Sequence, residues 1–148
     1  MGSRSWTPKV REALTAAGWA PGRKVDTGAW RTLFAEAGLV MHEAAESFLA
    51  EFGGLYVSVH GPGISVARTP FEFDPELLVG EEGRFEEWGE EIGRHLFPLG
   101  ELDEGRHFLG IDEFGEIYLV DMWVGSFGRM PEAMENLVLG VKPRRLTG

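Results

Sequence analysis

The spacing of apolar residues changes part-way along this chain, and that change restricts the fold more than any other feature of the sequence. From Pro8 to Phe52 apolar side chains recur three or four residues apart in three runs, and each run is followed by a glycine. This spacing is typical of helices that bury one face. From Leu55 to Val59 apolar and polar side chains alternate instead, as they do in a half-buried strand. We therefore expect three short helices followed by a sheet.

The rest of the chain continues the strand pattern around two further helices. A helical pattern covers residues 84–96, and Pro131 opens a last helix that Gly140 closes. Residues 141–148 are expected to form a frayed tail. The remaining segments with the composition of strands are residues 64–67, 71–73, 97–99, 108–112 and 116–124.

This order of elements predicts an α+β fold in a single domain spanning residues 1–148. The N-terminal helices should pack on a mostly antiparallel sheet of about five to six strands, with one helix inserted mid-sheet and one C-terminal helix.

Composition excludes several classes of protein. The 148 residues include no cysteine, which excludes a disulfide framework, a thiolate nucleophile and cysteine-ligated metal sites. The formal net charge of −10 argues against nucleic-acid binding, which needs a basic surface. Residues 1–6 are not followed by the apolar core of a secretion signal, and no apolar run reaches the roughly 20 residues of a membrane helix. We expect a cytoplasmic protein that binds neither nucleic acid nor membrane.

A search for catalytic and metal-binding motifs returns weak patterns only. The sequence lacks the glycine-rich phosphate loops and the nucleophile elbow. His42 and Glu46 stand one helical turn apart, but no second histidine completes a zinc motif, and an acidic helix start explains them better. The four histidines are scattered singly, so we interpret each as a surface or capping residue. We interpret residues 112–116 as a polar hairpin tip in which Gly115 adopts a positive φ, and we predict no catalytic residue, metal or cofactor.

The negative charge is concentrated in one stretch of the chain. Residues 72–116 carry fifteen acidic and three basic side chains, a balance of −12, whereas segments 1–71 and 117–148 each sum to +1. On a helical wheel of residues 84–96, the aromatic side chains fall on one side and four glutamates on the other. Glu90 and Arg94 should form a favourable pair one turn apart. The candidate partner-binding residues are Glu86, Glu87, Glu90, Glu91, Asp103 and Glu104.

This acidic surface has two interpretations. Most charge runs are only solvated faces, and acidic helices help to keep a protein in solution. Alternatively the surface docks a basic partner, because concentrated charge of one sign accelerates association with the opposite sign. A partner that binds nucleic acid must itself be basic, so an acidic protein is suited to antagonise it.

Five short motifs, taken in order, resemble the third group of the SUKH superfamily. Each consists of turn glycines and core aromatic residues, so their shared order carries the resemblance, which spans about residues 6–140. The motifs are Ala17–Arg23, Ala44–Leu55, Phe97–Gly100, Ile111–Tyr118 and Leu137–Gly140.

The resemblance implies an immunity protein of a bacterial polymorphic-toxin system, which protects a cell by binding a cognate toxin, often a nuclease or a nucleic-acid deaminase. It also implies an α+β fold without recognised catalytic residues, and we transfer no functional residue from the motifs. Two alternatives stay open, namely a scaffold or regulatory module that binds other proteins, and a small hydrolase that uses a carboxylate or His42. We interpret Trp6, Tyr56 and Trp123 as core residues rather than interface anchors.

Overall fold

The computed structural model describes residues 6–147. Residues 1–5, which belong to the segment inspected for a secretion signal, and Gly148 lie outside the described residues. The chain begins with the three helices α1 (Pro8–Ala17), α2 (Gly28–Ala35) and α3 (Glu43–Phe52). Four elements follow: the short strands β1 (Tyr56–Val57) and β2 (Phe71–Glu72), the 3₁₀ helix η1 (Pro75–Leu78) and α4 (Glu82–Ile92). The chain then forms β3 (Phe97–Leu102), β4 (His107–Ile111), β5 (Glu116–Val120), β6 (Val124–Arg129), α5 (Glu132–Leu139) and β7 (Arg144–Thr147).

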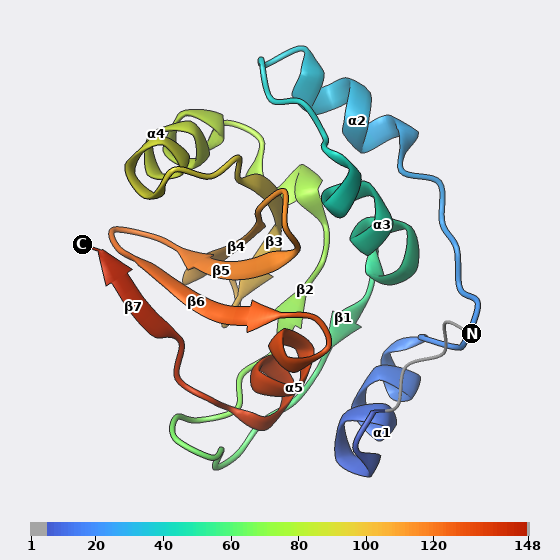
Figure 1. The fold of residues 1–148 in the computed structure, drawn as a ribbon. Coiled ribbons are helices and arrows are strands. Elements are labelled where there is room, and N and C mark those ends of the chain that lie inside the picture. Colours follow the sequence, from blue (N-terminus) through green and yellow to red (C-terminus); the bar gives the residue numbers. More distant parts are fainter. Residues whose placement is uncertain (1–5, 148) are drawn as a thin grey trace.

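The seven strands form one antiparallel sheet in which each strand pairs with its neighbour along the chain (Figure 1). The predicted α+β class is confirmed, and α4 is the helix inserted mid-sheet. The number of strands is larger than the expected five to six. The segment 116–124 holds β5, a turn at residues 121–123 and the first residue of β6, which continues to Arg129. The predicted strand at residues 64–67 is a loop bonded to Leu139 and Gly140.

The C-terminal tail was predicted to fray, and this prediction is wrong for Arg144–Thr147. These residues form β7 on the free edge of β6, with Arg144 opposite Ser126 and Thr147 opposite Val124. An edge strand exposes unpaired backbone N–H and C=O groups, so a polar segment can gain a place in the sheet through backbone hydrogen bonds alone.

Helices cover both faces of the sheet. Phe97 of β3 meets Phe34 of α2, with 5.3 Å between the ring centroids, and Phe97 pairs with Ile111 across the strands. Successive residues of a strand face opposite sides, so Gly110 points the other way. There the ring of Phe85 from α4 lies 2.9 Å from the position that a Cβ of Gly110 would take. In Figure 1, α4 accordingly stands at the upper left, apart from α1 and α3.

Of the three aromatic residues interpreted as core residues, only Trp6 is buried. Tyr56 is instead 42 % exposed, and Trp123 is half-buried. Tyr56 lies on the edge strand β1, where Val57 takes the inward position and Tyr56 therefore faces out. None of the helices within residues 6–147 is long and apolar enough to cross a bilayer.

Candidate functional site

The helix that carries the predicted acidic face is α4, and it ends earlier than expected. We expected a helix over residues 84–96, whereas α4 spans Glu82–Ile92 and is closed by Gly93 in the left-handed conformation (φ 71°). The Arg94 N–H then donates to the Gly89 carbonyl at 2.8 Å, so the chain turns back across the helix. A Cβ on Gly89 would lie 2.6 Å from the Arg94 carbonyl oxygen, so this turn depends on glycine at position 89.

The inner side of α4 docks on the sheet as the aromatic pattern predicts. Phe85 is fully buried, and Trp88 is half-buried. The Trp88 Nε1–H donates to the Asp121 carbonyl at 2.8 Å, at the turn between β5 and β6. Arg84 pairs with Glu81 at 3.0 Å and lies 3.8 Å from Asp121. These contacts fix the rotation of α4 about its axis and therefore decide which side chains face outward.

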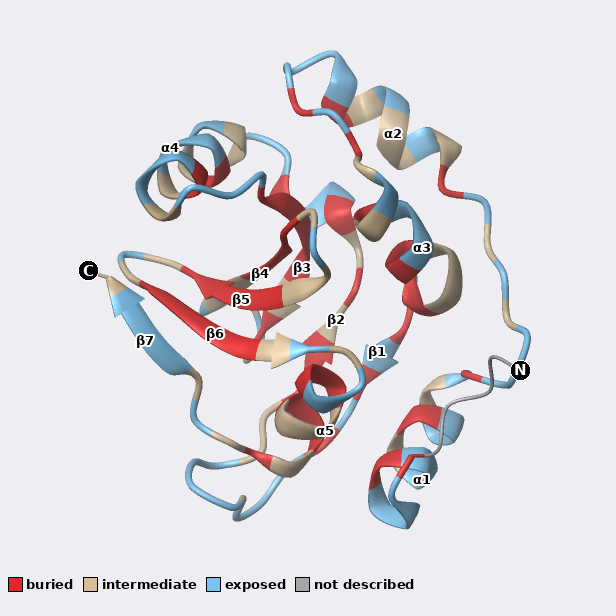
Figure 2. Cartoon of the chain, in the orientation of Figure 1, coloured by how far each residue is buried: buried red, intermediate tan, exposed pale blue. Residues whose placement is uncertain are grey.

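The outer side of α4 presents the four predicted glutamates. Glu86, Glu87, Glu90 and Glu91 are all exposed. Figure 2 shows exposed positions on the outer side of α4. Among the described residues, none of the four glutamate carboxylates takes part in a hydrogen bond or an ion pair. The expected pair between Glu90 and Arg94 is not formed, because the helix ends before Arg94.

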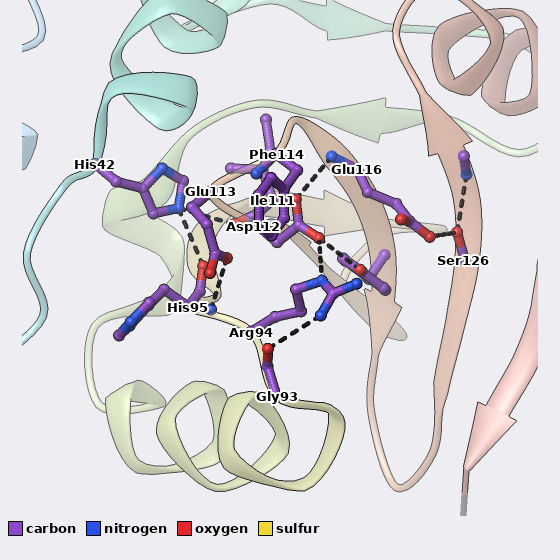
Figure 3. Close-up of polar contacts among 12 residues, drawn as sticks. His42, Gly93, Arg94, His95, Ile111, Asp112, Glu113, Phe114, Glu116 and Ser126 are labelled. Atoms are coloured by element: carbon purple, nitrogen blue, oxygen red, sulfur yellow. Dashed lines mark hydrogen bonds and ion pairs between the residues drawn. The ribbon is translucent and has the colours of Figure 1, made fainter.

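Arg94 instead ties the loop after α4 to a buried carboxylate. Its Nε lies 3.3 Å from Asp112 Oδ2, and Asp112 is 0 % exposed (Figure 3). The other Asp112 oxygen accepts the N–H groups of Phe114 at 2.8 Å and Glu116 at 2.9 Å. Burial raises the pKa of Tyr118 far above its ordinary value, and the hydrogen bond that the Tyr118 hydroxyl donates to Asp112 raises it further. Residues 112–116 form the predicted hairpin turn, but Asp112 is a buried anchor within it.

His42 holds the same loop from the other side. Its Nδ1 accepts the Ala45 N–H at 3.1 Å and so caps α3, which confirms the capping interpretation. This leaves the proton on Nε2, which faces the carbonyls of His95 at 3.1 Å and Ile111 at 3.3 Å (Figure 3). The His95 N–H in turn donates to Glu113 at 2.9 Å, and this bond lowers the pKa of Glu113 despite partial burial, which would raise it.

The other two predicted residues, Asp103 and Glu104, lie in the turn between β3 and β4. Both have a positive φ, 61° and 56°. Glu104 accepts the hydroxyl of Tyr56 at 2.9 Å, and Asp103 lies 4.0 Å from Arg106. Among the described residues, no hydrogen bond or ion pair joins this turn to the α4 glutamates. The six candidates therefore form two separate sets.

A comparison with protein families matches residues 6–140 to the family described as SUKH-3 immunity protein. The chain belongs to this family. The matched range includes α1 to α5 and β1 to β6, so α4 is part of the SUKH-3 domain. Comparisons with curated proteins and with solved structures gave no match.

In this SUKH-3 protein the structure also brings together two glutamates that sequence reasoning missed. Glu72 of β2 and Glu101 of β3 stand directly opposite each other across the strands. Partial burial, together with repulsion from neighbouring carboxylates, raises the pKa of both side chains. The signal in the sequence was weak. Glu72 alternates with the buried Phe71 and Phe73, so the pattern places Glu72 on the outward face of its strand. The register that sets Glu72 opposite Glu101 depends on how the two strands pair and cannot be predicted from neighbouring residues.

One pocket of the SUKH-3 protein bears on the hydrolase alternative. A pocket of about 320 Å³ is lined mostly by apolar side chains, including Leu119, Trp123 and Phe127. His107 lines it as well and has its Nδ1 2.8 Å from Asp121 Oδ2, which is the arrangement of a base and the residue that orients it. Among the described residues, no side-chain hydroxyl is hydrogen-bonded to His107. Residues 6–147 also contain no group of three or more side chains placed to hold a metal ion.

Proposed function

We propose that this SUKH-3 protein is an immunity protein that acts in the cytoplasm and neutralises a basic bacterial toxin domain by binding it, without catalysis. The outer face of α4 is the proposed contact surface. The observation that carries the proposal is the set of four exposed carboxylates on α4 that have no cationic or hydrogen-bonding partner among the described residues.

Several other acidic side chains of the same stretch have partners within the protein. Glu81 pairs with Arg84, Asp112 with Arg94, and Glu116 accepts the hydroxyl of Ser126. On α4, by contrast, Glu86 repels Glu90 and Glu87 repels Glu91. Like charges one turn apart cost a helix a few tenths of a kcal/mol per pair. A cationic partner would relieve this repulsion, because its charges would supply the counterions that the fold lacks.

The proposed partner follows from the same charge. A toxin domain that acts on nucleic acid needs a basic cleft to bind its substrate. An acidic helix can occupy that cleft, and the field of its carboxylates accelerates the encounter in a way that salt suppresses. Inhibition then needs no reaction, only occupancy of the surface that the nucleic acid would use.

The proposal predicts that a toxin gene lies beside this gene, and the test uses the toxin domain that such a gene encodes. We expect the reversal Glu87→Lys/Glu91→Lys to slow association with this domain by about ten-fold or more at low ionic strength and to weaken protection in co-expressing cells. The matched control Glu12→Lys/Glu36→Lys makes the same charge change at exposed positions outside α4 and should leave both unchanged. Wild-type association and protection in the α4 variant would contradict the proposed surface.

The scaffold alternative makes a different prediction. It predicts that no toxin gene is adjacent and that a pull-down at low ionic strength captures a basic protein that is not a toxin.

A further inference from the structure

A groove of about 760 Å³ lies between α4 and residues 38–42. Glu86, Gly89 and Glu90 form the α4 side of the groove, and Leu39 and Val40 form the opposite side. Arg94, His95 and Glu113 line the groove as well. The volume falls in the range of protein sites that enclose a ligand or a partner side chain.

Most polar groups of the groove are already engaged within the protein. Arg94 pairs with Asp112 and donates to the Gly93 carbonyl at 3.1 Å. Glu113 accepts the His95 N–H, and both ring nitrogens of His42 have partners. Glu86 and Glu90 are the carboxylates of the groove whose side chains have no hydrogen bond or ion pair among the described residues. Among the described residues, the groove therefore presents two carboxylates that have neither a hydrogen bond nor an ion pair.

The opposite side of the groove is apolar. Val40 is 78 % exposed, and it stands across from the glutamates. The Glu86 carboxylate reaches toward this side at Gly38, because Glu86 Oε2 lies 4.0 Å from the position that a Cβ of Gly38 would take. An occupant must therefore combine a cationic head with an aliphatic stem, as arginine and lysine do.

Glu86 and Glu90 are one helical turn apart, so their Cβ atoms are about 5–6 Å from each other. A planar guanidinium with five N–H donors can bond to both carboxylates, whereas an ammonium is a point charge. We propose that this groove receives an arginine side chain of the bound toxin, with its guanidinium bridging Glu86 and Glu90 and its stem against Val40. The identity of the partner rests on the proposed function, but the chemistry of the groove can be tested without it.

The first experiment is an NMR titration of the full chain with N-acetyl-arginine amide. We expect saturable shifts of the backbone amides of Gly38, Val40 and Gly89 at millimolar probe, and none with N-acetyl-citrulline amide, which has the same shape without the charge. The shifts should vanish in Glu86→Gln/Glu90→Gln and persist in Glu87→Gln/Glu91→Gln, which makes the same charge change outside the groove. No shift with the arginine probe, equal shifts with citrulline, or shifts that survive Glu86→Gln/Glu90→Gln would overturn the proposal.

The second experiment compares the same two variants in their binding to the toxin domain. Loss of an enclosed charge pair acts mainly on dissociation, so Glu86→Gln/Glu90→Gln should raise the dissociation rate by about ten-fold or more. Glu87→Gln/Glu91→Gln should act mainly on association and on its salt dependence. Equal, measurable effects of both pairs would overturn the groove and leave the proposed function standing. If neither pair affects toxin binding, the proposed contact between the groove and a toxin arginine is overturned together with the proposed toxin surface, whether or not the arginine probe binds.

Discussion

The substitution Asp112→Asn tests how the structure holds α4 against the sheet. Asp112 is fully buried, and one of its oxygens accepts two backbone N–H groups of the hairpin turn. The other oxygen accepts the Tyr118 hydroxyl at 2.6 Å and lies 3.3 Å from Arg94 Nε. An asparagine oxygen can keep the two backbone bonds. Its NH₂ group can neither accept from Tyr118 nor pair with Arg94.

Two charge-assisted contacts are therefore lost while their partners stay in place. Hydrogen bonds to charged groups contribute about 1.5–3 kcal/mol each, and the contribution of the Arg94 pair lies at the lower end of this range because the Arg94 side chain is 39 % exposed. We expect Asp112→Asn to lower the free energy of unfolding by about 3–5 kcal/mol, which is a large fraction of the roughly 5–15 kcal/mol typical of a domain. At about 2–4 °C per kcal/mol for a chain of this size, Tm should fall by about 6–20 °C.

Urea unfolding followed by tryptophan fluorescence measures this loss directly. The midpoint should fall with an unchanged slope, because the surface exposed on unfolding is the same. The control Glu91→Gln, an exposed position on α4, should stay within about 0.5 kcal/mol of wild type. A loss below about 1 kcal/mol for Asp112→Asn would refute the view that this carboxylate anchors the loop after α4.

Three further predictions follow from single contacts. Glu101→Gln should stabilise the protein by about 0.5 kcal/mol at pH 7, because it removes the like charge opposite Glu72. The raised pKa of Glu101 means that the folded state binds this proton more tightly than the unfolded state does. Protonated Glu101 therefore contributes to stability at low pH, and this contribution is lost as the pH rises through the pKa of Glu101 in the folded state. Urea titrations at pH 5 and pH 7 should therefore show a smaller difference between variant and wild type at pH 5; an equal difference at both would contradict this. His42→Ala should lower the free energy of unfolding by about 1–2 kcal/mol in the same assay. His42→Asn should lower it less, because the amide oxygen of asparagine can still cap α3. Equal losses in the two variants would show that the cap contributes nothing. Gly89→Ala should lower Tm, because its Cβ would be forced against the Arg94 carbonyl. Gly83→Ala on the same helix should raise Tm, because there is open space at its Cβ. A stabilising Gly89→Ala would show that the turn after α4 can shift.

Local sequence patterns predicted the helices and part of the sheet. Pro131 and Gly140 bracket α5 closely, and His42 is the cap that begins α3, because capping and periodicity act over one or two turns. The end of α4 was missed because Leu96 continues the apolar spacing past Gly93, although it belongs to the loop that enters β3. The strand β7 was missed because its polar residues are held by an edge of β6, which no local pattern reveals.

The candidate site, too, was predicted from the sequence only in part. The outward direction of Glu86, Glu87, Glu90 and Glu91 was predicted because a helix places residues three and four apart on one side. The burial of Asp112 was not predicted, because a carboxylate in a turn normally faces water. Its burial is tolerated because Arg94 and Tyr118, which come from other parts of the chain, supply it with partners.

By itself, then, the sequence determined that an acidic helix exists, which of its sides docks, and which four carboxylates point outward, because these properties depend on the geometry of a single helix. Tertiary structure alone decided that these carboxylates lack partners among the described residues, that Asp103 and Glu104 lie in a separate turn, and that Glu72 faces Glu101. The reason is physical: contacts between segments far apart in the chain depend on strand register and on packing, and neither is encoded in the spacing of neighbouring residues.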